Sequence, residues 1–310
     1  MKRNLTFLVF ILLLVALFTF SVCAAESTIE ADDIDDVTSA ISSAQQGDTV
    51  NIKLISDITF NQVIEINKAI TVNVTFNGYQ LSYTGNSGAN TTTAGFYVNN
   101  AGAILNLKGS NKLSNVEGYT HYDDSVKADM IGTGNLISVS YGTVNIEDAY
   151  LYATNNTFVV YNAWVDNADS IVVANSSVLR VKENATTSAI CYKGGNGKSQ
   201  SIVKRVLKLN NSVEYGGFFG TDYNFNLTKG SEFTNVKFYD FYIKNDCWYD
   251  PTHASTRALL MITVGEALPV TGCIFNTYNG ENGSGNVKIY TETAKQNLAL
   301  YNCLFIIISP

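Results

Sequence analysis

The side chains best suited to chemistry gather in one segment, residues 237–257. Cleaving a sugar chain takes either two carboxyl groups beside the bond or a base that removes a proton next to a uronic acid. The segment supplies an acid, a histidine and two basic residues that could converge in one groove: Lys244, Asp250, His253 and Arg257. Because these residue types are also ordinary in solvated loops, we expect them to be catalytic only if the protein is an enzyme.

Aromatic side chains are as prominent in this segment as ionisable ones. Exposed rings stack on the apolar faces of sugars and anchor protein contacts. The alternative is that some rings, such as Phe238 and Tyr242, simply pack against a core. The predicted binding residues are Trp248, Tyr249, Tyr242 and Tyr239, together with Trp164 from an earlier segment.

No metal or cofactor site is predicted. The two histidines of the chain, His121 and His253, lack the ligand spacing of a metal site. The acidic run at 32–36 lies at the start of an expected helix, where the helix dipole favours carboxylates, so a structural role explains it better than calcium. Paired Asp123 and Asp124 leave a surface calcium site open as an alternative.

A repeated phrase predicts the elements that must position these side chains. It consists of apolar, any, apolar, two mostly polar, small, any and apolar residues, and its copies begin at 144, 171, 207, 225, 268 and 298. Alternating apolar residues indicate a strand with one face inward, and the polar pair with the small residue indicates a corner. Such self-similarity is typical of a solenoid, in which each coil covers its neighbour. The small residues should form one column along the stack: Ala149, Ser176, Ser212, Ser231, Cys273 and Cys303.

Stacking in register would bring like side chains together on neighbouring coils. Strands lie about 4.8 Å apart, within the Cα range of a disulfide, although parallel Cβ vectors oppose the bond. A Cys273–Cys303 disulfide and a stack of two buried thiols therefore both remain open. Asparagines at corners, such as Asn175 and Asn211, tolerate turn conformations, and their amides can form ladders between coils.

The first residues predict export. Residues 1–25 have the form of a signal peptide, because Lys2 and Arg3 precede an apolar run that ends in small residues suited to cleavage. An uncleaved membrane anchor is the alternative. No later apolar stretch approaches the roughly 20 residues that a spanning helix needs. We therefore expect a secreted or cell-surface protein without a membrane span after cleavage.

The charge balance narrows the range of partners. The chain has 20 basic and 27 acidic residues, a net charge of −7. Cleavage would remove Lys2 and Arg3, leaving 18 basic residues and a net charge of −9. Nucleic-acid binding takes concentrated basic charge, so we expect no nucleic-acid partner.

Two regions are predicted in the mature chain. Residues 26–47 should form an N-terminal capping helix, with Ile34, Val37 and Ile41 on one face and Gly47 ending the helix. Residues 48–310 should form an all-β solenoid, a parallel β-helix. A helix at its start would cover the apolar core and the unpaired edge of the first coil.

The entry region of this chain resembles a known superfamily. The resemblance rests on the predicted helix, Gly47-Asp48-Thr49-Val50, Asp57–Phe60, a lysine before Ile70-Thr71-Val72, and Asn77–Leu81. These features are similar to secreted proteins of the pectin-lyase-like superfamily, and most of all to adhesin-like surface proteins of methanogenic archaea and anaerobic bacteria. The resemblance implies a right-handed parallel β-helix with three parallel sheets per turn and an N-terminal helix. The Asn-Thr-Asp, Gly-His-Gly and Arg-Ile-Lys motifs of the superfamily's polygalacturonate hydrolases do not occur in this sequence, so their catalytic residues cannot be carried over.

The sequence therefore predicts an adhesin-like, non-catalytic protein that presents loops to an extracellular glycan or a surface protein. A polysaccharide lyase or glycoside hydrolase of unrecognised subtype is one alternative. Another is a structural envelope component whose chains associate end to end.

Overall fold

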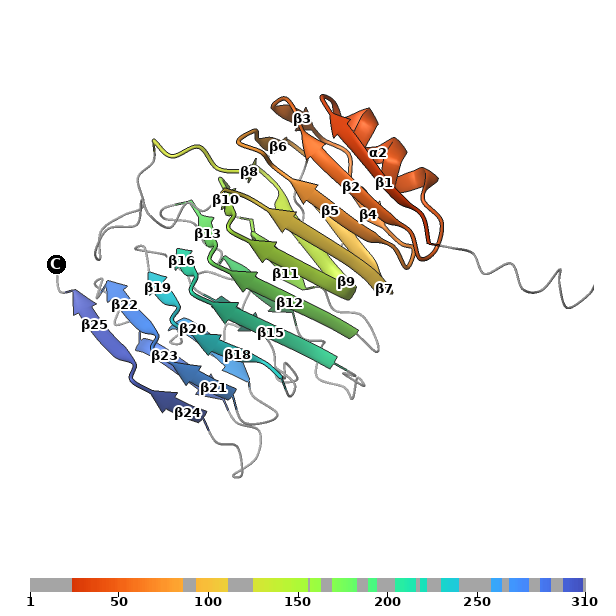
Figure 1. Ribbon diagram of the computed structural model, residues 1–310. Coiled ribbons are helices and arrows are strands. Elements are labelled where there is room, and N and C mark those ends of the chain that lie inside the picture. The colour runs from red at the N-terminus through yellow and green to blue at the C-terminus, as the bar shows by residue number, and fades with distance from the viewer. Residues whose placement is uncertain are drawn as a thin grey trace, which may run out of the picture.

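The computed structural model describes residues 24–85, 93–110, 125–155, 157–162, 169–182, 189–193, 204–215, 218–221, 230–239, 258–263, 268–278, 285–290 and 298–308. Within these ranges a single helix accompanies β-strands, and all the strand pairings are parallel. Figure 1 shows the strands stacked in chain order, from the end that carries the helix to the end that carries β24 and β25. The protein is thus all-β and built of large parallel sheets, an architecture compatible with the predicted solenoid.

The strands recur in three rows, which the chain visits in a fixed order: β2, β3 and β4 are paired in turn by β5, β6 and β7. The first row contains β1 (Glu26–Ala31), β2 (Thr49–Leu54), β5 (Thr71–Thr75), β12 (Asp169–Asn175), β15 (Lys204–Asn210), β18 (Glu232–Thr234), β21 (Leu268–Thr271) and β24 (Leu298–Tyr301). The second row contains β3 (Ile58–Phe60), β6 (Leu81–Tyr83), β8 (Met130–Gly132), β10 (Tyr150–Ala153), β13 (Val178–Val181), β16 (Val213–Tyr215), β19 (Lys237–Tyr239), β22 (Ile274–Tyr278) and β25 (Leu304–Ile308).

The third row shares two long strands with the first. It contains β4 (Ile64–Ile66), β11 (Val160–Asn162), β14 (Ile190–Lys193), β17 (Phe218–Thr221), β20 (Ala258–Thr263) and β23 (Gly285–Tyr290). The strands β7 (Ala94–Lys108) and β9 (Asn135–Glu147) pair with third-row strands through their first residues and with first-row strands through their last. These two strands join the first and third rows into one continuous sheet.

First-row strands such as β2, β5 and β12 alternate between a buried and a more exposed face. In β2, Val50, Ile52 and Leu54 are buried, while Lys53 between them is exposed. This period of two is the reason that the segment forms a strand with one face inward. The same inward positions recur in the neighbouring strands and join into one apolar core.

The chain leaves the first row through residues with a left-handed backbone. Their φ angles lie between 47° and 64°, a region that glycine and asparagine adopt most readily. From each corner but the last, the backbone N–H donates to a carbonyl of the next coil, at 2.8–3.1 Å. The corner residues are Asp148, Ser176, Asn211, Asn235, Gly272 and Asn302. Asn211 confirms the predicted use of asparagine in a turn, whereas Asn175 is the last residue of β12.

The residue after each corner belongs to the column of small residues, which the sequence predicted in part. Ala149, Ser212, Cys273 and Cys303 are confirmed members, since the strands on either side of them pair in register. Ser176 is wrong by one residue because it is itself a left-handed corner, and Ser177 takes the column position. Ser231 is also wrong, because it precedes β18 and its hydroxyl accepts from the Leu207 N–H at 3.1 Å. Val236 occupies the column in that coil.

Asparagine amides form the predicted ladder, although on the outer face of the first row. Asn73 donates to Asn51, Asn106 to Asn73, and Asn145 to Asn106, with Nδ2–Oδ1 distances of 2.6–2.7 Å. A second link joins the corners, where Asn235 donates to Asn211 at 3.1 Å. Because each rung spans neighbouring coils, the ladder holds the strands in register.

The helix is shorter than the sequence predicted. It spans α2 (Ile34–Ser43), while residues 26–31, expected to be helical, form β1 in register with β2. The helix starts at 34 because the Asp33 carboxylate accepts the Asp36 N–H at 2.9 Å and caps the first turn. Its end is fixed by Lys68, whose Nζ donates to the carbonyl oxygens of Ser42 and Ala44 at 2.7 and 2.8 Å. Val37 and Ile41 are buried, and α2 packs on β1, β2 and β3.

Within the described residues, α2 is too short to cross a lipid bilayer and no other helix occurs. The predicted signal peptide lies in residues 1–25, of which 1–23 fall outside the described ranges.

The stacked cysteines Cys273 and Cys303 carry free thiols in the structure. Cys273 lies directly beside Cys303 in the stack, as the pairing of β21 with β24 and of β22 with β25 requires. Burial raises the pKa of the Cys273 thiol to about 11. The stack of thiols is therefore the arrangement that the structure supports.

The buried face of α2 yields a stability prediction. Ile41→Asp should lower the free energy of unfolding by at least about 3 kcal/mol, because it removes buried apolar surface and buries a carboxylate. Urea unfolding measures the change. Ser39→Asp, on the exposed face of the same helix, should shift the value by no more than about 0.5 kcal/mol. Equal stability of the Ile41 variant and the wild type would show that α2 is not packed on the core.

A second prediction concerns the thiols. At pH 8 a maleimide or iodoacetamide should modify the half-buried Cys303 and leave Cys273 unmodified until the protein unfolds, because a buried protonated thiol is a poor nucleophile. Peptide mass spectrometry resolves the two sites. A non-reduced mass two hydrogens below the value for free thiols, lost in the Cys303→Ser variant, would instead show the disulfide.

Candidate functional site

Most of the predicted site residues fall outside the described part of the chain. These are Trp164, Tyr242, Lys244, Trp248, Tyr249, Asp250, His253 and Arg257. Tyr239 is described, at the end of β19, and its side chain is only 5 % exposed. Phe238 beside it is fully buried and stacks on Phe275, with ring centroids 5.1 Å apart. The alternative that Phe238 packs against the core is thus confirmed, and Tyr239 offers little ring surface to a ligand in this conformation.

The second row nevertheless positions a cluster of rings on its outer face. Leu151 and Ala153 in β10 point into the core, so the alternation turns Tyr150 and Tyr152 outward. Their outward positions continue into the neighbouring strands. We call the outward-facing residues of the second row the outer strip: Tyr150, Tyr152, Val178, Arg180, Val213 and Tyr239.

Arg180 joins the two tyrosines of β10. Its Nη1 donates to the Tyr150 hydroxyl at 3.1 Å, and its guanidinium carbon lies 4.6 Å from the centre of the Tyr152 ring. The two rings are stacked, with centroids 6.2 Å apart. Arg180 and Tyr150 are almost fully buried, whereas Tyr152 is half-buried. A cation over a ring is attracted to its face, which favours this arrangement, and Tyr152 keeps a partly exposed ring.

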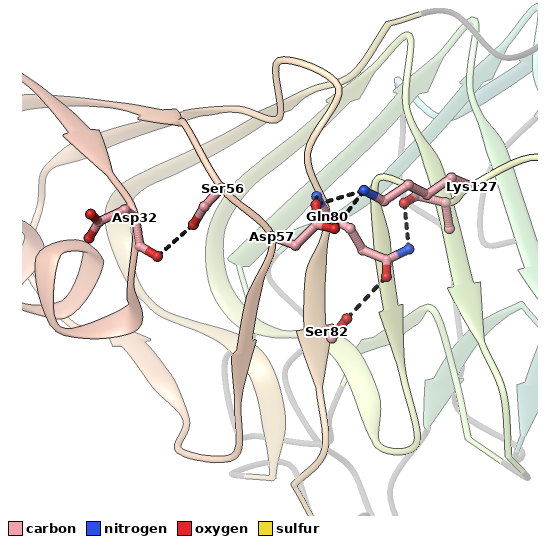
Figure 2. Close-up of polar contacts among 7 residues, drawn as sticks. Asp32, Ser56, Asp57, Gln80, Ser82 and Lys127 are labelled. Atoms are coloured by element: carbon pink, nitrogen blue, oxygen red, sulfur yellow. Dashed lines mark hydrogen bonds and ion pairs between the residues drawn. The ribbon is translucent and has the colours of Figure 1, made fainter.

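A group of polar side chains borders the outer strip on the side of the helix. We call Asp57, Gln80, Ser82 and Lys127 the polar clamp, which Figure 2 shows. Lys127 donates to both carboxylate oxygens of Asp57, at 2.6 and 2.8 Å. Gln80 donates its side-chain amide to the Ala128 carbonyl at 2.8 Å and accepts from the Ser82 hydroxyl at 3.2 Å.

The polar clamp ties a distant segment to the first coils. The hydrogen bond from Lys127 lowers the pKa of Asp57, and the Gln80 backbone N–H at 2.9 Å acts in the same direction. Two residues after Lys127, Asp129 is buried, and its carboxylate accepts the Tyr150 N–H at 2.9 Å. Residues 126–131 are held against the outer strip in this way, and Val126, Ala128 and Ile131 pack on its rings.

The acidic run at the helix start has the structural role that the sequence predicted. Carboxylate oxygens of Asp32, Asp33 and Asp36 lie within 4.8 Å of one another. Asp33 caps α2, and the Asp36 carboxylate accepts the Asp32 N–H at 3.2 Å. The Ser56 hydroxyl donates to the Asp32 carbonyl at 2.6 Å, which fixes the run to the first coil (Figure 2).

Sequence reasoning missed a groove between α2 and β4. The groove encloses about 340 Å³ and has an apolar floor that includes Ile41, Ile64 and Ile66. Glu65 and Lys68 stand on its rim, although the Lys68 ammonium is already bound to the end of α2. The groove lies where α2 faces residues 63–70, which are distant from it in the sequence, and no motif predicts it.

The described surface combines three features. It offers a ring surface at Tyr152, hydrogen-bonding groups on the polar clamp and a small groove beside α2. The carboxylate of Asp57 forms an ion pair with the Lys127 ammonium. A search of protein-family models finds no match to this chain, and a search of curated proteins finds no significant similarity.

Loss of Lys127 from the polar clamp should change the local dynamics of the chain. Lys127→Met should speed amide hydrogen exchange in residues 125–129 and destabilise the protein by no more than about 1 kcal/mol, because both partners are half exposed. The pKa of Asp57 is lower in the folded protein than its ordinary value of 3.8. The stability difference between wild type and variant should therefore be present above pH 3.8 and disappear as the pH falls through the pKa that Asp57 has in the folded protein. Lys53→Met, which breaks the exposed pair with Glu30, is the matched control and should leave residues 125–129 unchanged. Unaltered exchange in the Lys127 variant would contradict the clamp.

Proposed function

We propose that this chain is a right-handed parallel β-helix of the pectin-lyase-like type, closed at its N-terminal end by α2. The repeated order of the three rows and the parallel pairing support the solenoid. The packing of Val37 and Ile41 on the first coil supports the capping role, because an uncovered coil would expose apolar core to water.

The proposed function is that of a secreted or cell-surface, adhesin-like protein that binds an extracellular glycan or a surface protein without turnover. The observation that carries the proposal is the contrast between regular rows and unequal connections. At corners such as 176–177 and 211–212 two residues separate consecutive strands, whereas 21 residues (109–129) separate β7 from β8 and 18 residues (240–257) separate β19 from β20. A rigid scaffold with long connections at fixed places is suited to presenting contact surfaces, since binding residues concentrate in such connections.

The outer strip connects the scaffold to the aromatic segment. Tyr239 is the last residue of β19, so the chain enters residues 240–257 directly from the strip. Rings in that segment and Tyr152 would offer apolar faces to sugar rings. Export, carbohydrate binding and the family are proposals that rest on the sequence pattern and this placement.

A glycan array probed with the purified mature protein tests the binding, with reducing-sugar and unsaturated-uronate assays run on the same preparation. Trp248→Ala with Tyr249→Ala should weaken binding about 5- to 200-fold, equivalent to about 1 to 3 kcal/mol of lost stacking. Binding constants from calorimetry or surface plasmon resonance measure the change.

The ionisable residues of the same segment provide the matched control. His253→Ala with Arg257→Ala should leave glycan affinity nearly unchanged. If the wild type cleaves a uronate polymer and this double variant does not, the protein is a lyase or hydrolase and the adhesin proposal fails.

A further inference from the structure

The backbone of Ala25 ties the start of β1 to the first coil. Its N–H donates to the Asp48 carboxylate at 2.8 Å, and its carbonyl oxygen accepts the Thr49 N–H at 2.8 Å. Glu26 follows as the first residue of β1 and pairs with Thr49 in register. Ala24 and Ala25 are both exposed, so the expected signal peptide meets the fold at an accessible peptide bond.

The Asp48 carboxylate is oriented toward this bond by the loop that follows α2. Its second oxygen accepts the Gln45 N–H at 2.7 Å, and the Asp48 N–H donates to the Gln45 carbonyl at 3.0 Å. The N–H groups of Gln45 and Ala25 lower the pKa of Asp48, and the Lys68 ammonium acts in the same direction. Asp48 is therefore ionised at neutral pH, while both described donors to its oxygens are uncharged backbone groups.

The position of signal-peptide cleavage decides whether this carboxylate gains a charged partner. Hydrolysis of the bond between Ala24 and Ala25 consumes one water molecule, leaves a carboxylate on Ala24 and turns the Ala25 N–H into an α-ammonium group. A charged donor forms a stronger hydrogen bond with a carboxylate than a neutral N–H does. Hydrolysis one bond later would instead remove Ala25, and with it the groups that bind Asp48 and Thr49. The sequence permits both cuts, because both alanines are small.

We propose that the exported chain begins at Ala25, one residue earlier than the sequence pattern predicted, and that the Asp48 carboxylate binds its new α-ammonium group. Processing then converts a neutral contact at the start of β1 into an ion pair. The inference rests on the export that the proposed function includes, and it does not depend on what the protein binds.

Expression of the full chain in a secreting host tests the cleavage site, with the N-terminal peptide of the exported protein identified by mass spectrometry. The exported protein should begin at Ala25. A product that begins at Glu26, or at any other residue, overturns the inference and leaves export intact. A full-length product retained in the cell overturns export and the inference together.

The exported protein also tests the ion pair. An α-amine reacts with an acylating reagent only when it is deprotonated, and an adjacent carboxylate raises the pKa of the ammonium group above its ordinary value of about 7.7–8.0. With N-hydroxysuccinimide acetate at pH 7, Asp48→Asn should therefore be acetylated at Ala25 at least about 3-fold faster than the wild type. Unfolding the wild type in urea should raise its rate in the same way. Because Ala25 is exposed in the fold, burial does not explain a slower rate.

The matched control is Glu30→Gln, which removes an exposed carboxylate of the same strand that accepts from Lys53. It should be acetylated at the wild-type rate. Equal rates in the wild type and in an Asp48→Asn variant with an unchanged circular dichroism spectrum would overturn the ion pair. Equal rates in the folded and the urea-unfolded wild type would do the same without any substitution.

Discussion

The register between neighbouring coils is the constraint on which the rest of this structure depends. In a strand, a shift of one residue turns every inward side chain outward. The coils avoid such a shift by leaving the first row at a left-handed residue that donates its N–H to the next coil. Asparagine amides on the outer face add a second set of links between the same coils. Apolar burial supplies the driving force, but these corners and ladders select the one register in which it is realised.

A fixed register also determines what the outer faces present. Because Leu151 and Leu179 must face the core, Tyr150, Tyr152 and Arg180 are placed together on the outside. The polar clamp then holds Lys127 beside Asp57, and Val126, Ala128 and Ile131 pack against the same cluster. The position of the outer strip therefore follows from core packing.

The sequence predicted the architecture better than its details. The copies that begin at 144, 207, 268 and 298 have the correct register because small residues and turn formers mark their corners. The copy placed at 171 is one residue early, since Ile171, Val172 and Val173 are all apolar and hide the period of two. The copy at 225 is wrong because Ser231 stands where Leu207 stands in the preceding coil, and a hydrogen bond, not apolar burial, satisfies it. Residues 26–31 form a strand because they pair with β2. The helix signals in the local sequence do not reveal this tertiary pairing.

The sequence predicted less of the candidate site than of the fold. Residue types marked the segment at 237–257, but they could not show that Phe238 and Tyr239 are buried. Arg180 and the polar clamp carry no motif, because their partners lie in other coils. The partner of Lys127, Asp57, is 70 residues away along the chain and adjacent only after the coils have stacked.

Cross-linking between β15 and β18 tests the register most directly. Lys208 pairs with Glu232, and their side chains form an ion pair at 3.4 Å, whereas the repeat in the sequence alone would align Lys208 with Asn226. Cysteines at each pair can be treated with a short bis-maleimide and the linked peptides identified by mass spectrometry. The account predicts efficient linkage of Lys208→Cys with Glu232→Cys and little linkage of Lys208→Cys with Asn226→Cys. The reverse result would contradict the register on which the core, the corners and the outer strip depend.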